Sequence, residues 1–335
     1  MEYPKFKVCC RCFTFNQAKY ITDAMNGFTM QQTSFPFVST IVDDASTDGE
    51  QEVIRKYVED NFDFSEGSVA YHKETDYAHI TYAQHKANKN CYFAVLYLKE
   101  NHYSQRKPKL GYLSEWRDMC EYEAICEGDD YWIAGDKLHK QVNFMNNHPD
   151  CGMCYTKSKM YDQSTNSFLT KTFGGPGTTS DYFIFTGNPV PTATVMLRFS
   201  AHKQYLEAKR QLPEFKMGDY VSWLWMSANS KIAFLPVITS VYRLLPKSAS
   251  HSDNPRIEFI NSSYDLRCYF HDLLGYTNKE IIERQRVTKI LKEYAYYKYF
   301  RQYMQYFIYA IQKDWKNLFV IENWAALWYF IRISK

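Results

Sequence analysis

Two short acidic clusters each follow a run of apolar residues. Residues 41–44 read IVDD, and residues 125–130 read ICEGDD. Adjacent carboxylates repel one another unless a cation offsets their charge, and hard divalent cations prefer carboxylate oxygens. A cation held there would clamp a diphosphate and neutralise the charge that develops as the diphosphate leaves. The clusters therefore predict a Mg²⁺ or Mn²⁺ site suited to diphosphate chemistry.

Acidic pairs of this kind also have a purely structural interpretation, as a turn followed by a helix N-cap. Two pairs at the ends of separate strands favour a ligand site, because open α/β sheets bind ligands outside the carboxyl ends of their strands. Gly128 fits this hypothesis, since glycine lets backbone approach a ligand closely. The sequence has neither a GxxxxGK[ST] segment nor a GxGxxG after the first apolar run, which excludes two other phosphate-binding patterns.

The elements that would position these clusters alternate between strand and helix patterns, which predicts a largely parallel sheet with covering helices. The predicted strands are Phe6–Phe15, Phe37–Val42, Val69–His72, Tyr122–Cys126, Pro191–Leu197 and Ile232–Tyr242. The predicted helices are Gln17–Gly27, Gln51–Asn61, Ala87–Glu100, Asp136–Asn147 and Asp219–Ala228. From about residue 254 onward only helical periodicity is evident. We therefore expect an α/β domain over residues 1–250 and a helical region over 251–335.

Composition excludes several classes of protein. The chain has 335 residues, 18% of them aromatic, and is too rich in aromatics to be disordered. Its net charge is +3 without a long basic stretch, so no nucleic acid partner is implied. We find no signal-peptide pattern and no run of 18 uncharged apolar residues. With nine cysteines and no export signal, we expect a cytoplasmic protein whose cysteines are core or surface thiols.

At the acidic clusters the chain resembles the inverting family 2 glycosyltransferases, which have the GT-A fold, a Rossmann-like mixed sheet flanked by helices. Thr14-Phe15-Asn16 stands where that family has a Thr/Ala-Tyr-Asn step. Residues 42–48, VDDASTD, are close to its VDDGSTD motif, with Ala45 in place of glycine. Residues 127–132, EGDDYW, resemble its DxD-type segment in the form of a bacterial subgroup. The resemblance covers roughly residues 5–250, so the remaining helices would be a C-terminal appendage.

The resemblance implies a metal-dependent, inverting transfer of a sugar from a nucleotide-diphosphate donor, in the first place a UDP-sugar. The acceptor would be a hydroxyl of a glycan or lipid-linked molecule in surface polysaccharide synthesis. Donor nucleotide binding is implied for Thr14, Phe15, Asn16, Asp43, Asp44 and Glu127, and Mn²⁺ or Mg²⁺ binding for Asp129 and Asp130.

The general base of the family lies on a later helix, where Met217-Gly218-Asp219-Tyr220 is the match, so Asp219 is the candidate catalytic residue. A carboxylate within hydrogen-bond reach can take the proton of an attacking hydroxyl. Asp219 would equally serve as the N-cap of the helix that follows it.

Three further residues are weaker candidates for contact with the acceptor or the diphosphate. They are Trp132, Arg243 and His251. Trp132 also fits a role in core packing, and the other two fit packing or solvated positions. Residues 85–90, HKANKN, match the family's donor-binding Arg/Asn-x-Gly segment poorly, which leaves the identity of the donor open.

The region after about residue 278 mixes aromatic residues with scattered Lys and Arg. That mixture fits peripheral contact with the inner face of a membrane, or a helical bundle that packs on the catalytic domain or on a second subunit in a homo-oligomer. Two other functions remain as alternatives. One is a nucleotidyltransferase, whose usual Gly-rich basic signature Cys9–Asn16 lacks. The other is a degenerate protein that binds a glycan or a partner, against which the intact aspartates argue.

Overall fold

The computed structural model describes residues 3–245 and 255–325, and the chain divides into two compact units. The first unit comprises Met1–Thr178, Pro189–Arg210 and Asn229–Leu244. The second comprises Thr179–Asn188, Gln211–Ala228 and Leu245–Lys335. The second unit thus takes in two earlier segments besides the C-terminal helices, while the predicted boundary near residue 250 falls in 246–254, outside the described residues.

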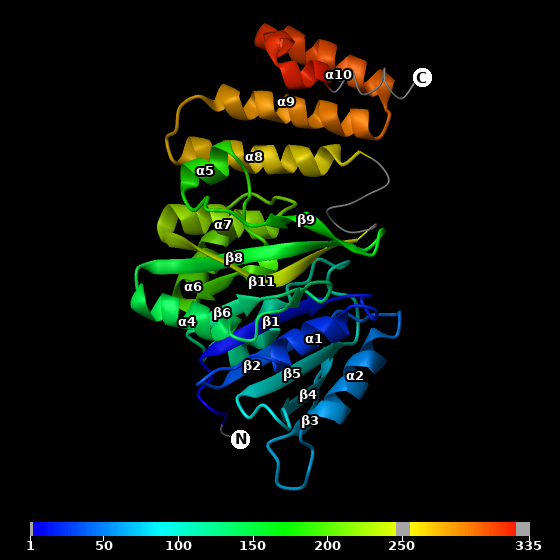
Figure 1. Ribbon diagram of the computed structural model, residues 1–335, viewed down its shortest axis with the longest axis vertical. Helices are drawn as coiled ribbons and strands as arrows, with labels where there is room; N and C mark the ends of the chain where they lie inside the picture. Colours follow the sequence, from blue (N-terminus) through cyan, green and yellow to red (C-terminus); the bar gives the residue numbers. More distant parts are fainter. Residues whose placement is uncertain (1–2, 246–254, 326–335) are drawn as a thin grey trace. The chain divides into compact units, whose positions relative to one another are not determined.

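The first unit is built on one mixed sheet of eleven strands. The strands are β1 Val8–Thr14, β2 Phe37–Asp43, β3 Tyr71–Glu74, β4 Ala78–Gln84, β5 Cys91–Leu98, β6 Tyr122–Ile125, β7 Tyr131–Trp132, β8 Cys151–Asp162, β9 Ser167–Phe173, β10 Met196–Arg198 and β11 Lys231–Leu244. Their order is β3-β4-β5-β2-β1-β6-β10-β8-β11-β7, and β9 pairs with β8 (Figure 1). Strands β5, β2, β1 and β6 run parallel to one another and form the part of the sheet that carries the acidic clusters.

Helices of the first unit are α1 Ile21–Thr29, α2 Glu50–Asn61, α3 Ser114–Arg117, α4 Lys137–Asn147 and α6 Phe199–Ala208, with 3-10 turns at Leu110–Leu113, Thr192–Thr194 and Lys209–Gln211. In α1 the apolar residues Ile21, Ala24, Met25 and Phe28 recur at helical spacing, and all four are buried. Helices α1 and α2 cover the same face of β1, β2 and β5 (Figure 1).

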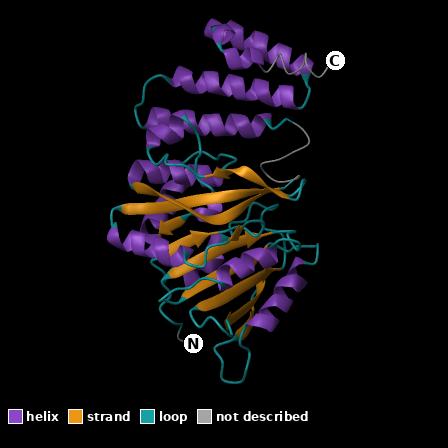
Figure 2. Ribbon diagram, viewed as in Figure 1, coloured by secondary structure: helices purple, strands orange, loops and turns teal. Residues whose placement is uncertain are grey.

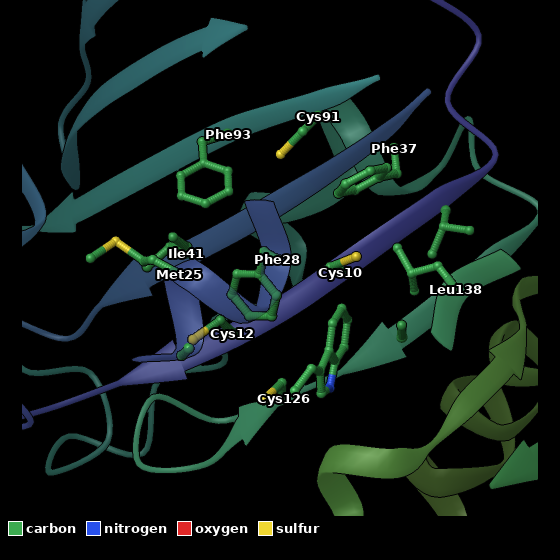
Figure 3. Close-up of a cluster of buried hydrophobic side chains, with 14 of the residues drawn as sticks. Cys10, Cys12, Met25, Phe28, Phe37, Ile41, Cys91, Phe93, Cys126 and Leu138 are labelled. Atoms are coloured by element: carbon green, nitrogen blue, oxygen red, sulfur yellow. The ribbon is translucent and has the colours of Figure 1, made fainter. Parts of the chain in front are cut away.

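Apolar residues alternate between the two faces of the parallel strands, so each face has its own core. Cys10 and Cys12 of β1 point toward α1, where Phe28 lies with its ring 6.2 Å from that of Phe93 of β5 (Figure 3). Cys9 belongs to the core of the opposite face. Burial on both faces explains why the central strands are nearly continuous apolar runs.

The structure confirms the predicted mixed α/β fold and most of the early elements, but the helix expected over Ala87–Glu100 is wrong. That segment contains β5, every residue of which is buried between β2 and β4. An eight-residue apolar run has no clear period, so strand and buried helix look alike in sequence. Strand β4 and the β8–β9 hairpin were not predicted either.

The second unit consists of helices within its described residues, as Figure 2 shows. They are α5 Ser180–Phe185, α7 Gly218–Asn229, α8 Ile257–Leu273, α9 Lys279–Tyr296 and α10 Phe300–Lys313, followed by a 3-10 turn, η4, at Trp315–Phe319. Leu291, Ala295, Tyr303 and Phe307 form the core between α9 and α10. In the described part of the chain no helix is long and apolar enough to cross a membrane.

All nine cysteines lie in the described residues, and all are buried free thiols. This confirms the interpretation of the cysteines as unpaired thiols and places them in the core. Burial raises the pKa of the Cys12 thiol well above the usual value for cysteine, so this thiol stays protonated and unreactive. Buried cysteines of this kind contribute to the core as small apolar side chains.

Candidate functional site

Both predicted acidic clusters lie at one edge of the sheet, the edge formed by the carboxyl ends of its central parallel strands. Thr14 at the end of β1 is paired in register with Asp43 at the end of β2. Strand β6 runs parallel to β1 on its other side and leads into residues 126–130. Backbone hydrogen bonds extend this alignment past the strands, from Asp44 N to Thr14 O at 3.0 Å and from Gly128 N to Phe13 O at 3.3 Å. The ends of three adjacent strands therefore bring the acidic side chains together.

Asp44 is fully engaged by a loop that follows β5. Its carboxylate accepts hydrogen bonds from the backbone N–H groups of His102 at 2.7 Å and Tyr103 at 3.0 Å. Lys109 completes the set with an ion pair of 2.6 Å to Oδ2. Asp44 is fully buried and thus anchors residues 101–109 at the edge of the site.

Asp43 is buried too, but its carboxylate is only partly satisfied. Oδ1 accepts hydrogen bonds from the backbone of Ser46, at 3.1 Å, and from the side chain of Gln51. Oδ2 is buried and has no hydrogen-bond partner. Burial raises the pKa of Asp43, although these two donors oppose the effect. The first Asp of the pair therefore keeps one acceptor oxygen free.

Thr14 and Asn16 hold the turn after β1 against the turn after β2. The Thr14 hydroxyl donates a hydrogen bond to Glu50, a fully buried carboxylate that also accepts from Ser46 Oγ at 2.8 Å. Asn16 Oδ1 accepts from the N–H of Thr47 at 2.8 Å. Phe15, between them, exposes 43% of its surface. Of the predicted Thr14-Phe15-Asn16 step, Thr14 is buried, whereas Phe15 and Asn16 are exposed.

The 127–130 turn carries three carboxyl groups in a tight backbone. A Cβ on Gly128 would lie 2.2 Å from Thr14 Oγ1, so no larger residue fits without movement. Burial raises the pKa of Glu127 to about 7, with Arg11 opposing. Burial likewise raises the pKa of Asp129, and burial together with the Asp129 charge raises that of Asp130 well above its usual value. Burial and the neighbouring negative charge both make the ionised form of these carboxyl groups less favourable. A bound cation would stabilise that ionised form.

Arg243 of β11 binds this turn through its backbone and its side chain. Its backbone N–H donates to Asp130 Oδ1 at 2.8 Å, and its Nη1 donates to the carbonyl of Asp129 at 2.7 Å. Nη2 forms an ion pair with Asp23 of α1. The guanidinium also lies 4.5 Å from the centre of the Tyr131 ring. Among the described residues, Arg243 thus links β11, α1 and the acidic turn.

The remaining predicted residues lie elsewhere. Trp132 is in the core, where its Nε1 donates to the Ala193 carbonyl at 2.7 Å and the Lys137 ammonium lies 4.2 Å from its ring centre. Asp219 belongs to the second unit, exposed in the first turn of α7. His251 lies outside the described residues.

Sequence reasoning missed several residues that shape this edge. Glu50, Gln51, Lys109 and Arg11 all interact with the predicted carboxylates or with Thr14. Glu50 and Gln51 could have been found, because they open the helix directly after the VDDASTD segment. Lys109 could not, because 65 positions separate it from Asp44 and no local pattern links them.

No family model matches the chain. Proteins of Mycobacterium tuberculosis and Mycobacterium bovis, named as uncharacterized, are 30% identical to it over 147 residues. That match spans 42% of this chain and about a third, 32%, of the length of each relative.

Solved structures of S. aureus TarS 1-349 are similar in fold. The complex with UDP is 19% identical and covers 86% of this chain and 72% of that one, with a TM-score of 0.51. The complex with UDP-GlcNAc is 17% identical and covers 92% and 81%, also with a TM-score of 0.51. This likeness confirms the predicted architecture, a large mixed sheet flanked by helices.

Proposed function

We propose that the chain is a glycosyltransferase that moves a sugar, with inversion, from a nucleoside-diphosphate donor to a hydroxyl group. The observation that carries the proposal is the gathering of Asp43, Asp44, Glu127, Asp129 and Asp130 at the carboxyl ends of two strands, β2 and β6, which flank β1. The TarS structures of similar fold hold UDP and UDP-GlcNAc, which supports a UDP-sugar as the donor. The proposed acceptor is a glycan or lipid-linked molecule of surface polysaccharide synthesis in the cytoplasm.

A divalent cation fits the donor set of this edge. The described residues contain no group of three or more His, Cys, Asp or Glu side chains placed to hold a metal alone. Mg²⁺ is usually held by one or two carboxylates together with substrate phosphates, and Asp129 and Asp130 would supply that small number. When bound, Mg²⁺ or Mn²⁺ would neutralise the diphosphate as a leaving group.

The other residues of the edge bind and orient the donor in this proposal. The exposed ring of Phe15 and the backbone turn at Asn16 line the place of the base and ribose. Asp43 contributes its unpartnered oxygen, and Glu127 the side chain whose charge Arg11 partly offsets. Asp44 acts indirectly, because it holds the 101–109 loop in place.

Asp219 is the proposed general base. Its carboxylate would take the proton of the acceptor hydroxyl while the hydroxyl oxygen forms a bond to the anomeric carbon. The bond from that carbon to the diphosphate oxygen breaks, and the nucleoside diphosphate leaves with the electron pair. A single displacement of this kind inverts the anomeric carbon.

A thermal-shift panel tests the donor site. Intact protein is heated with UDP, GDP or CDP, each with and without Mn²⁺, beside the Asp129→Asn variant. A nucleotide present at about 100 times its dissociation constant adds roughly 2.7 kcal/mol of stability, which is several degrees. We expect the shift with UDP and Mn²⁺, and its loss in Asp129→Asn.

Asp60→Asn is the matched control, because Asp60 is an exposed carboxylate of α2 whose partner is Lys56. It should retain the full shift. If no nucleotide stabilises the intact protein under any metal condition, the transferase proposal fails and a degenerate binding protein becomes the better hypothesis. If the shift appears without metal and survives Asp129→Asn, the metal role of the acidic turn is wrong.

A further inference from the structure

The segment after α10 has its polar residues inside and its apolar residues outside. Asn317 and Asn323 are buried, 3% and 0% exposed, whereas Trp315, Phe319 and Ile321 are 64%, 68% and 79% exposed. A surface segment of a water-soluble fold normally shows the reverse pattern. Such an arrangement exposes apolar area that costs free energy unless something covers it.

Hydrogen bonds fix this inverted orientation. Asn317 Nδ2 donates to the carbonyls of Ala310 and Asp314, both at 3.0 Å. Asn323 Nδ2 donates to Asn317 O at 3.1 Å, and its Oδ1 accepts from Thr288 of α9 at 2.7 Å. The two asparagines therefore tie the segment to α9 and α10, and the apolar side chains between them are held outward.

The outward side chains form one C-terminal aromatic patch: Trp315, Leu318, Phe319, Ile321 and Trp324. The Trp315 and Phe319 rings are 5.6 Å apart, and Trp324 Nε1 donates to the Leu318 carbonyl at 2.6 Å. Indole side chains favour the interface between water and lipid, because they combine an apolar ring with a polar N–H group, and the phenyl ring of Phe319 adds apolar area to the same patch.

The surroundings of the patch are positively charged. Lys313 and Lys316 flank Trp315 and are exposed, while the intervening Asp314 forms an ion pair of 3.1 Å with Arg284. Glu322 is the other acid of this region.

We propose that the C-terminal aromatic patch docks onto an anionic lipid surface, with Lys313 and Lys316 facing the headgroups. This goes beyond the proposed transfer reaction and does not depend on it. The contact that we propose is one of surface side chains with the headgroups and the outer part of the acyl region. A two-fold dimer through the same patch would bring these lysines toward their own copies, and that repulsion favours lipid over a second copy.

Vesicle co-sedimentation of the full chain, without nucleotide, tests the proposal. The vesicles are phosphatidylcholine alone or phosphatidylcholine mixed with phosphatidylglycerol. We expect binding to the mixed vesicles that weakens with salt. Lys313→Gln/Lys316→Gln should reduce the partition coefficient about 25-fold, since each cation near the surface is worth roughly fivefold. Trp315→Ser/Phe319→Ser should reduce it at least about tenfold on both kinds of vesicle.

Phe168→Ser is the matched control, because Phe168 of β9 is an exposed aromatic residue of the first unit. It should bind vesicles as the intact protein does, and circular dichroism confirms that each variant folds. The proposal is overturned if the intact protein ignores anionic vesicles, or if Trp315→Ser/Phe319→Ser binds them equally well. It is also overturned if light scattering shows a dimer that this variant converts to monomer. The nucleotide thermal shift is a separate measurement, so failure of the donor site would be recognised independently.

Discussion

The backbone N–H of Arg243 donates a hydrogen bond of 2.8 Å to the carboxylate of Asp130, which lies 113 positions earlier in the chain. The guanidinium of the same residue binds the carbonyl of Asp129 and the carboxylate of Asp23. Arg243 was predicted to contact the acceptor or the diphosphate, and that contact stays a prediction. In the structure its Nη1 and Nη2 bind the protein, while its Nε is buried without a hydrogen-bond partner. Its geometry is that of a residue that positions the acidic turn from β11.

Replacing Arg243 should separate the two kinds of contact. In Arg243→Ala the backbone bond to Asp130 survives, while the guanidinium contacts to Asp129 and Asp23 are lost. Hydrogen bonds to charged groups contribute about 1.5–3 kcal/mol, so we expect a loss of roughly 2 kcal/mol in the free energy of unfolding. The nucleotide-induced thermal shift should fall as well, because Asp129 loses its support. Urea unfolding and the nucleotide panel measure the two effects.

Arg210→Ala is the control for this experiment. Arg210 is an exposed arginine of the 3-10 turn Lys209–Gln211, so its removal should change stability by less than about 0.5 kcal/mol. An Arg243→Ala protein that retains the full nucleotide shift would show that the acidic turn does not need this support.

Gly128 should not tolerate even a methyl group. The added Cβ would approach Thr14 Oγ1 to 2.2 Å and Gln17 Oε1 to 2.4 Å, both within the network that joins β1 to α2. Overpacking of this kind typically costs about 1–3 kcal/mol. In Gly128→Ala we therefore expect lower stability in urea unfolding and a weakened or absent shift with UDP and Mn²⁺.

Gly111→Ala is the comparison, since a Cβ at Gly111 would meet nothing within 4 Å. It should unfold within about 0.5 kcal/mol of the intact protein and keep the nucleotide shift. Equal behaviour of the two alanine variants would mean that the turn relaxes freely, contrary to its close packing against Thr14.

The sequence predicts the edge of this sheet well because the signals there are local. Apolar runs that end in acidic turn residues mark the ends of β2 and β6 and place Asp43 and Asp129 at one edge. Strand β5 was misread because it is buried on both faces and lacks a period of two. The ties of Lys109 to Asp44 and of Arg243 to Asp130 were beyond prediction, since each joins residues more than 60 positions apart.

Ala45 offers a test that concerns the backbone alone. Its φ angle is 59°, in the left-handed region, at the position where the resembled VDDGSTD motif has glycine. A left-handed conformation costs a residue with a Cβ about 1–2 kcal/mol, and glycine avoids that cost. After allowance for the greater entropy of glycine in the unfolded chain, Ala45→Gly should raise the free energy of unfolding by about 0.5–1 kcal/mol.

An alanine-to-glycine substitution in a helix should instead lower the free energy of unfolding. Ala228 lies in α7, and Ala228→Gly should lower stability by up to about 1 kcal/mol. If Ala45→Gly destabilises the protein to a similar degree, the strain assigned to the turn after β2 is absent.

Glu123 should make stability depend on pH in the acidic range. It is fully buried on β6, where its carboxylate accepts a hydrogen bond from His202 Nδ1 at 2.8 Å and lies 3.1 Å from Arg11 Nε. Burial alone would raise the pKa of Glu123, but attraction to His202 and Arg11 outweighs it and lowers the pKa from 4.5 to about 2. A carboxyl group with a depressed pKa in the folded state stabilises the fold above its unfolded pKa.

That contribution is therefore complete above about pH 4.5 and is lost as the pH falls toward 2. A shift of this size corresponds to about 3 kcal/mol. Glu123→Gln removes it and leaves Arg11 and His202 without their counter-charge, so the variant should be less stable at pH 7. Urea unfolding across the acidic range should show the difference between the two proteins shrinking as the pH falls. Parallel pH profiles would mean that Glu123 titrates alike in the folded and unfolded chains, and that the buried ion pairs contribute nothing to its ionisation.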